Sequence, residues 1–374
     1  MLRPRYIYLF VISFFVVISS TGALSAQFRT VTDSAQREVT IPRTVDRIIC
    51  SGAGCLRLVT YLGAQNLVLA VDDIEKRKRR FDARPYALAN PRFKKLPVFG
   101  EFRGHDDPEK ILGLDPLPQV IFKTYPSMGY DPQELQEKTG IPVITLNYGN
   151  LGKHRKALYR SLTIMGTILG KEKRSKEVIR FFEDEIQTLD GLCKASASLN
   201  QRRCYVGGIA FKGPHGFSST EPSYPPFVFV HAQNLAAAGG FAGRNMMHSQ
   251  VSKEKILEWD PEILFLDLST LQMGDHAGGL YELRTDPVYQ SLSALKREQV
   301  FGVLPYNWYS QNFGSILANA WFIAKVIYPD RFSDIDPAAK ADDIYEFLVG
   351  KPVFGQMNTY FQSMVFKPVP MQEN

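Results

Sequence analysis

Cysteine is scarce in this chain of 374 residues, which contains four cysteines. So few cysteines exclude a disulfide-rich scaffold. Cys193 and Cys204 bracket a polar stretch and could pair if their Cα atoms came within about 7 Å, whereas a bond between Cys50 and Cys55 is the less favoured pairing. A small buried thiol is the favoured interpretation of Cys50, because it ends an apolar run.

Motifs of common catalytic sites are also missing. The sequence has no G-x-S-x-G elbow, no H-E-x-x-H and no C-x-x-C, and no cluster of histidines and carboxylates stands at metal-ligand spacing. Residues 51–55 (SGAGC) lack the ending of a phosphate-binding Walker loop. One enzyme alternative stays open, a cysteine hydrolase in which a helix N-terminus activates Cys55. We expect a protein that is not an enzyme and carries no cofactor.

The chain also lacks a strong excess of charge of one sign. Lys and Arg number 44 against 38 Asp and Glu, a formal net charge of +6, which falls to +4 if Arg3 and Arg5 are removed. This balance gives no support for a nucleic-acid partner. The basic run at residues 75–80 (EKRKRR) is interpreted as a solvated loop. A mildly basic surface favours anionic ligands.

The first 26 residues have the pattern of a secretory signal peptide. Arg3 and Arg5 precede a long apolar stretch, and small residues follow, with a cleavage point after Ser25 or Ala26. The alternative is a retained N-terminal membrane anchor, for which the apolar run is long enough. No cysteine stands near the cleavage point, which argues against a bacterial lipid anchor. We therefore predict export to the periplasm.

The rest of the chain alternates between short apolar runs and helical patterns. Residues 38–52 are predicted to form two short strands with a proline turn, and residues 66–72, 119–125 and 141–148 are further predicted strands. Residues 96–102 are predicted to be a short extended piece, and helical spacing is found in residues 55–65, 108–115 and 132–140. Residues 153–195 are almost entirely helical, and alternation resumes near residue 202. This order predicts a parallel α/β architecture. The hydrophobic fraction of 45% and about 350 mature residues suggest two lobes.

An internal repeat supports the two lobes. EKILGLDP spans residues 109–116, and EKILEWDP spans residues 254–261. An apolar strand pattern follows each copy. We therefore predict two similar α/β units separated by the long helical segment.

These stretches resemble the helix-linked class of substrate-binding proteins of ABC importers, which take up iron chelates and cobalamin. The resemblance covers about residues 31–357 and includes DRIICSGAGCLRLVTYLGAQNLVLAVDD, GPHGFSSTEPSYPPF, VSKEKILEWDPEILFLD and YNWYSQN. It is strongest for the iron-complex branch, which has molybdate- and tungstate-binding relatives. It implies two Rossmann-like lobes, residues 27–170 and 196–374, joined by one long rigid helix at residues 171–195, with a ligand cleft between the lobes.

The resemblance places the loop after the first sheet strand at this cleft. Ser51, Gly52 and Gly54 would leave backbone N–H groups free at a helix N-terminus, which suits an anion, so the loop from Ser51 to Cys55 is a candidate ligand wall. The alternative is a tight strand-to-helix turn. Arg57 is either a counter-charge for an anionic ligand or the partner of a structural carboxylate.

Two further segments are candidate walls. The first, residues 213–227, is rich in Gly, Pro and hydroxyl groups, and its His215, Ser218, Ser219 and Tyr224 could donate to an oxyanion or ligate a metal. A structural role is the alternative for His215, since no second histidine stands at ligand spacing. The second, residues 306–312, offers Asn307, Trp308 and Tyr309, which suit a small-ligand cleft or the packing of the following helix.

The resemblance also implies partners. Glu109 and Glu254, which open the two repeats, match the acidic residues that meet arginines of the importer's membrane subunits; the alternative is that both are only favourable first-turn residues. We expect a monomer that captures an iron chelate, with molybdate or tungstate as the second candidate. Free Fe or Zn ions are less favoured, and cobalamin and haem stay open. An exported ligand sensor is the alternative from another class.

Overall fold

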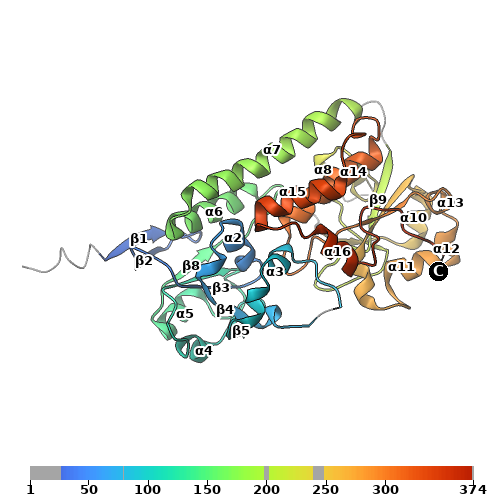
Figure 1. Cartoon of the computed structure of the whole chain (residues 1–374). Helices are drawn as coiled ribbons and strands as arrows, with labels where there is room; N and C mark the ends of the chain where they lie inside the picture. Colours follow the sequence, from blue (N-terminus) through green and yellow to red (C-terminus); the bar gives the residue numbers. More distant parts are fainter. Residues whose placement is uncertain (1–26, 79, 198–201, 239–247, 373–374) are drawn as a thin grey trace, which may run out of the picture.

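A computed structural model describes residues 27–78, 80–197, 202–238 and 248–372. It has a mixed α/β architecture in which two separate parallel sheets form the cores of two lobes (Figure 1). We call each sheet, with the helices that cover it, the first and the second lobe, in chain order. The predicted signal peptide or anchor lies outside the described residues. Among the helices of the described residues, none combines the length and the hydrophobicity that a membrane span requires.

The first lobe is built on six strands in the order β6-β5-β4-β3-β7-β8, parallel except for the β5–β6 pair. The strands are β3 (Ile48–Ser51), β4 (Val68–Asp72), β5 (Val98–Glu101), β6 (His105–Asp106), β7 (Val120–Thr124) and β8 (Val143–Leu146). A hairpin of β1 (Phe28–Thr32) and β2 (Glu38–Pro42) precedes them. The helices are α2 (Cys55–Tyr61), α3 (Pro85–Ala89), α4 (Pro108–Leu112), α5 (Pro132–Thr139) and α6 (Arg155–Leu169).

Both faces of this sheet are buried, as the continuous apolar strand runs predict. Ile49 and Ile121 point to one face, where they pack with Ile111 of α4 and Leu135 of α5. The neighbouring residues, such as Ile48, point to the other face and join the cluster that includes α2 and α6. Helices therefore cover the sheet on both sides, and the carboxyl ends of its parallel strands share one edge.

The second lobe is built on four parallel strands in the order β11-β9-β13-β14. They are β9 (Arg203–Gly207), β11 (Gln233–Asn234), β13 (Ile263–Asp267) and β14 (Val300–Val303), and a separate antiparallel pair joins β10 (Ser219–Thr220) to β12 (Ser249–Gln250). The helices are α8 (Pro225–Phe229), α9 (Leu235–Ala238), α10 (Lys253–Trp259), α11 (Gly278–Thr285), α12 (Pro287–Gln290), α13 (Ser293–Lys296), α14 (Phe313–Ile327), α15 (Pro337–Val349) and α16 (Phe354–Tyr360). Short 3₁₀ helices span Gln65–Leu67, Asp73–Glu75, Pro91–Lys95 and Leu268–Met273.

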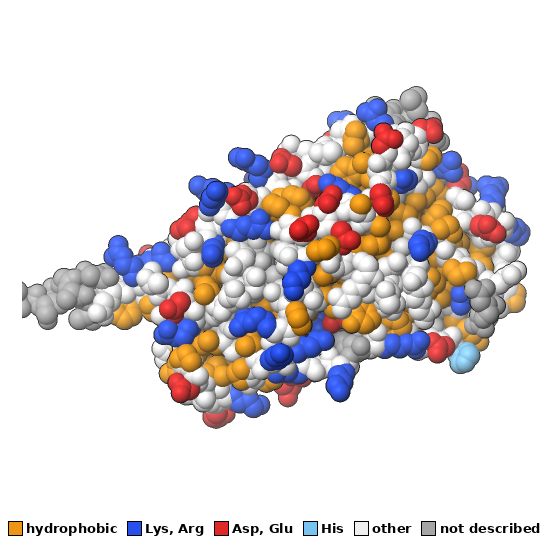
Figure 2. All heavy atoms as spheres, in the orientation of Figure 1, with side chains coloured by type: hydrophobic (Ala, Val, Ile, Leu, Met, Phe, Trp, Pro, Cys, Tyr) orange, Lys and Arg blue, Asp and Glu red, His pale blue; other side chains and the backbone are white. Residues whose placement is uncertain are grey.

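The longest of the described helices, α7 (Glu172–Ala197), lies in the chain between the two sheets. Its 26 residues span about 39 Å, and it contacts α6 of the first lobe and α8 and α14 of the second (Figure 1). Over α7 and α15, basic and acidic side chains are intermixed on the visible surface (Figure 2). α7 overlaps residues 171–195, and its role as the rigid linking helix and the predicted lobe boundaries stay predictions.

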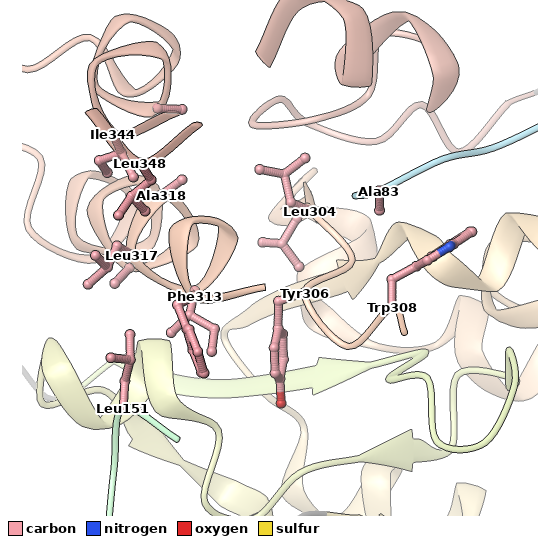
Figure 3. Packing of buried hydrophobic residues seen from close by; sticks show 14 of the residues in the cluster. Ala83, Leu151, Leu304, Tyr306, Trp308, Phe313, Leu317, Ala318, Ile344 and Leu348 are labelled. Atoms are coloured by element: carbon pink, nitrogen blue, oxygen red, sulfur yellow. The ribbon is translucent and has the colours of Figure 1, made fainter. Parts of the chain in front are cut away.

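One apolar cluster continues from one lobe to the other. It includes Leu151 of the first lobe, Phe313 of α14 and Leu348 of α15 (Figure 3). The Phe313 ring packs against Tyr148 of the first lobe, with ring centroids 5.1 Å apart, and against Phe182 of α7 at 6.0 Å. The base of the space between the lobes is therefore closed by aromatic packing.

Candidate ligand-binding cleft

A cavity of about 740 Å³ lies between the two lobes. Its first-lobe wall includes Tyr125 and Tyr148, and its second-lobe wall includes Phe211 and Tyr306. The remaining lining residues are Ser34, Ala35, Ala53, Arg103, Pro126, Ser127, Met128, Thr145, Leu146, Asn147, Gly149, Asn150, His154, Lys212, Asn307, Ser310 and Gln311. Aromatic rings with scattered amides and hydroxyls are the usual lining of a small-molecule site.

A smaller cavity of about 210 Å³ shares five lining residues with it, namely Ala53, Arg103, Lys212, Asn307 and Ser310. Residues from both lobes line this cavity too, including Phe102 of the first lobe and Trp308 and Tyr309 of the second. The two cavities together form the cleft, and the shared residues stand where they meet.

The electrostatic character of the cleft comes from two cations. Arg103 and Lys212, from opposite lobes, line both cavities, and no Asp or Glu is among the described lining residues. Each cation lies near an aromatic ring, Arg103 over Phe102 and Lys212 over Phe211, and neither makes an ion pair with a described residue. The cleft therefore favours an anionic ligand, because its positive charges have no carboxylate to compensate them.

The glycine-containing loop that follows β3 meets the cleft at one residue. Ala53 lines both cavities. Gly52 and Gly54 both have a positive φ, and a side chain on Gly52 would overlap the Thr124 carbonyl oxygen. The hydroxyl of Ser51 accepts from Lys123 Nζ at 3.2 Å, beneath the loop. This geometry is that of a tight strand-to-helix turn, and a ligand contact of Ser51 or Gly52 stays a prediction.

Cys55 is enclosed at the start of α2. Its side chain has no exposed surface, and Sγ donates to the carbonyl of Phe122 at 3.5 Å. Burial, followed by its contact with Cys50, raises the thiol pKa well above its ordinary value. A cysteine nucleophile needs the opposite shift. All four cysteines are buried free thiols, so neither of the pairings considered from the sequence is formed in this structure.

Arg57 joins the two lobes. Its guanidinium, which is 1% exposed, donates to the carbonyls of Trp308 at 3.2 Å, Tyr309 at 3.1 Å and Gln311 at 2.8 Å, and also to the Tyr148 hydroxyl. No carboxylate among the described residues forms an ion pair with it. The structure thus gives Arg57 main-chain partners in place of the structural carboxylate considered from the sequence, and its action on a ligand stays a prediction.

The 306–311 segment is held across the cleft by side chains of both lobes. Tyr309 and Ser310 have φ values of 50° and 67°, in the left-handed region. The Tyr309 hydroxyl bonds to the carboxylate of Asp72, and the Ser310 hydroxyl lies 2.7 Å from that of Tyr125. Burial raises the pKa of Asp72 to about 8, assisted by the charge of Glu75. Backbone strain of this kind is common where a segment forms a binding site.

The predicted residues of this segment have different environments. Asn307 lines both cavities, and its amide donates to the Ala210 carbonyl at 2.8 Å. Trp308 and Tyr309 line the smaller cavity. These three residues therefore line the space between the lobes, and their contact with a ligand stays a prediction.

The residues predicted in the 213–227 segment lie behind the lining rather than in it. His215 Nε2 is 2.7 Å from the Phe211 carbonyl, and the Ser219 hydroxyl donates to the Ile209 carbonyl at 2.7 Å. Tyr224 is fully buried and accepts from the Asn319 amide at 3.3 Å. We therefore expect these side chains to act on a ligand through the residues in front of them.

Sequence reasoning missed the lining residues Arg103, Tyr125, Tyr148, Phe211 and Lys212. Each follows the carboxyl end of a parallel strand by one to five residues, after β5, β7, β8 or β9. Ligands of open α/β sheets bind outside these strand ends. That rule, applied to the predicted strands, is the signal that could have identified them.

Glu109 and Glu254 occupy equivalent places on the two lobes. Both are exposed in the first turn of a short helix, α4 or α10, after the capping residues Asp107 and Ser252. α4 lies at the end of the first lobe away from α7 (Figure 1). Neither glutamate lines the cleft, so docking to a membrane partner stays a prediction for both.

Comparison with known proteins gives one family and several similar structures. The sequence model described as "Periplasmic binding protein" matches residues 49–305, more than half of the chain. The molybdate-binding protein MolA of Haemophilus influenzae is 25% identical over 88% of this chain and 93% of its own length. The iron-uptake system-binding protein of Bacillus subtilis is 21% identical over 52% of this chain and 56% of its own.

Solved structures show the same fold. MolA bound to molybdate superposes with a TM-score of 0.64 at 20% identity, covering 87% of this chain and 98% of its own. A periplasmic solute-binding protein of Veillonella parvula has a TM-score of 0.66 at 15% identity, and the match covers 90% of this chain and 97% of the Veillonella chain.

Proposed function

The chain belongs to the periplasmic binding protein family, and on this premise we propose that it captures an anionic ferric chelate in the periplasm and delivers it to an ABC importer. The observation that supports this most is the larger cavity between the lobes, which has aromatic walls and two cations without a carboxylate. The proposed role requires capture and release and no catalytic residue.

The volume of the larger cavity favours an organic chelate. Sites for drug-sized ligands measure about 300–1,000 Å³, and this cavity measures about 740 Å³. The side chains of Tyr125 and Phe211, which are less buried than Tyr148, offer apolar contact area to the organic part of such a ligand. Arg103 and Lys212 offer charge-assisted hydrogen bonds to its anionic oxygens, each worth about 1.5–3 kcal/mol.

Capture uses both lobes, because each supplies one cation and part of the aromatic wall. A ligand that bridges Arg103 and Lys212 binds better when the lobes approach each other, so it shifts the population toward the closed arrangement. The aromatic packing of Phe313 at the base of the cleft keeps this motion small.

A molybdate or tungstate ion is the second candidate, and the smaller cavity favours it. A water molecule occupies about 30 Å³ in the liquid, so an ion with four oxygens needs roughly 120 Å³, much closer to 210 Å³ than to 740 Å³. The amide of Asn307 and the hydroxyl of Ser310, beside the two cations, suit a tetrahedral oxyanion. The similarity to the molybdate-binding protein MolA is a further reason to test it.

A thermal-shift screen tests both candidates. The panel consists of a ferric tris-catecholate, a ferric trihydroxamate, haem, cobalamin, molybdate and tungstate, with sulfate as a control anion. A ligand at 100 times its Kd stabilises the folded protein by about 2.7 kcal/mol and so raises Tm. We expect the largest shift with the ferric tris-catecholate. A shift with molybdate alone would replace the first candidate by the second, and no shift with any compound would count against both.

A further inference from the structure

Two histidines that are 33 residues apart in the sequence come together behind the second-lobe wall of the cleft. His215 precedes β10, and His248 immediately precedes β12. The antiparallel pairing of β10 with β12 brings their rings to a centroid distance of 5.3 Å. Both side chains are half-buried, so they are reachable from solvent.

The hydrogen bonds fix the same tautomer in both rings. His215 Nε2 lies 2.7 Å from the Phe211 carbonyl, which can only accept, so this nitrogen carries a proton. His248 Nε2 lies 3.0 Å from the Ser219 hydroxyl, whose own proton goes to the Ile209 carbonyl. That hydroxyl therefore accepts from His248 Nε2. In the neutral form of each ring, the Nδ1 atom keeps a free lone pair.

Hydrogen-bond acceptors such as the Phe211 carbonyl and the Ser219 hydroxyl commonly support metal-binding histidines. A ligating imidazole donates its other N–H to a carbonyl, carboxylate or hydroxyl, which fixes the ring and raises its basicity. Burial, followed by the nearby His215, lowers the pKa of His248, which favours the neutral form of the ring. The Phe211 ring stacks on His248 with centroids 4.5 Å apart and restrains it.

We propose that His215 and His248 bind a divalent late first-row transition-metal ion, such as Cu²⁺ or Ni²⁺, through their Nδ1 atoms. Imidazole nitrogens lie about 2.0–2.1 Å from such ions, so two imidazoles that share one ion have ring centres about 5 Å apart. The observed 5.3 Å fits this arrangement. The described residues contain no group of three or more His, Cys, Asp and Glu side chains that could hold a metal, so water completes the coordination.

The metal site is separate from the cleft, because neither histidine lines the cavities. It touches the cleft wall through Phe211, whose carbonyl accepts from His215 and whose ring stacks on His248. The proposal does not depend on which ligand the cleft takes.

Cu²⁺ titration of the tag-free protein tests the site, by calorimetry and by electron paramagnetic resonance. We expect one Cu²⁺ per chain at this site, with superhyperfine splitting from two equivalent nitrogens. His215→Gln and His248→Gln should each weaken Cu²⁺ binding at least tenfold and reduce the superhyperfine splitting to that of one nitrogen. The double variant should no longer bind Cu²⁺ at this site. His231→Gln is the matched control, since His231 is half-exposed and bonds to Asp190 elsewhere.

Circular dichroism and Tm establish that each variant is folded before titration. Equal Cu²⁺ affinity in the wild type and in the double variant would overturn the proposal. A wild-type spectrum with one nitrogen, or a loss of binding in His231→Gln, would overturn it as well.

Discussion

At the scale of single residues, Arg57 shows how a buried cation can join two lobes without a carboxylate. Its guanidinium donates to three main-chain carbonyls of the 306–311 segment and to the Tyr148 hydroxyl. Rings of Tyr86 and Tyr148 lie 5.1 and 5.8 Å from the guanidinium carbon. Carbonyl oxygens and aromatic faces together compensate the charge, and they fix the strained segment against the first lobe.

Arg57→Gln should therefore destabilise the protein. A hydrogen bond to a charged group contributes about 1.5–3 kcal/mol, and a glutamine cannot replace all four, so we expect the free energy of unfolding to fall by about 3 kcal/mol. Denaturant unfolding measures this loss. Arg331→Gln, at an exposed position, should stay within about 0.5 kcal/mol of the wild type. Equal losses in the two variants would contradict the account of Arg57.

Asp72 gives a prediction about pH. Its pKa is about 8 in the folded protein because it is buried, against 3.8 as its ordinary value. Between about pH 4 and pH 8, Asp72 is therefore protonated in the folded state and ionised in the unfolded state. The free energy of unfolding falls as the pH rises through this range, because the unfolded state binds fewer protons. The fall is at most about 1.4 kcal/mol per pH unit and ends above about pH 8.

Asp72→Asn should remove this dependence. The stability of the variant relative to the wild type is expected to rise from pH 5 to pH 8 and to level off at higher pH. Urea unfolding at pH 5, 6.5, 8 and 9 measures the difference, and it isolates Asp72 from the other titrating groups. A difference that stays constant with pH would show that the folded-state pKa of Asp72 is not raised.

At the scale of elements, the strand-loop-helix unit β3–α2 depends on its glycines for backbone reasons. Gly52 has a φ of +86°, and a Cβ there would overlap the Thr124 carbonyl oxygen. Gly63, after α2, has a φ of +65°, and a Cβ there would meet nothing within 4 Å. The two positions share the left-handed conformation and differ in the space around them.

Alanine substitutions at these two glycines distinguish the energetic cost of the left-handed backbone from the cost of a steric overlap. Gly63→Ala should lower the free energy of unfolding by about 1–2 kcal/mol, which is the penalty of a left-handed L-residue. Gly52→Ala should lower the free energy of unfolding by this amount and by about 1–3 kcal/mol more, because the Thr124 carbonyl of β7 has to move. Chemical denaturation of both variants provides the comparison. Similar losses would mean that the loop relaxes without strain.

Most elements of this fold can be predicted from the sequence, because their signals are local. The predicted strands correspond to β3, β4, β7 and β8, and the capping signals of Pro132 and Gly140 bound α5. The long helical segment corresponds to α6 and α7. The two-residue strands β10 and β12 have no comparable signal, and their pairing depends on contacts between distant residues.

The candidate site was less predictable than the fold for the same reason. The 306–312 segment was identified because aromatics and amides are adjacent in sequence there. Arg103 and Lys212 are 109 positions apart, and only the packing of the two lobes brings them to opposite sides of one cleft. The pairing of His215 with His248 likewise follows from β10–β12 register rather than from spacing.

At the scale of the whole molecule, the repeat around Glu109 and Glu254 gives each lobe an exposed acidic residue on a helix that does not line the cleft. If these residues meet arginines of the importer, as the resemblance implies, their charge affects docking and not ligand capture. A first-turn role alone would contribute only about 0.3–1 kcal/mol of stability each.

The double variant Glu109→Arg, Glu254→Arg separates these roles. It should bind ligand as the wild type does, yet fail to support uptake in cells or to stimulate the importer's ATPase. A variant with Glu134→Arg and Glu258→Arg, one exposed glutamate from each lobe, makes the same change in net charge at other surface positions and should retain uptake. Normal uptake by the first variant would reject the docking role.

We propose that the cations between the lobes select an anionic ferric chelate, and calorimetric titration with one anionic and one neutral chelate distinguishes this from binding that ignores charge. We predict that a trianionic ferric tris-catecholate binds more tightly than a neutral ferric trihydroxamate of similar size. Arg103→Gln and Lys212→Gln should each weaken the anionic chelate about ten- to hundredfold and leave the neutral one unchanged, while Lys351→Gln, outside the cleft, changes neither. Equal affinity for the two chelates, or full affinity for the anionic chelate in both cleft variants, would contradict the account.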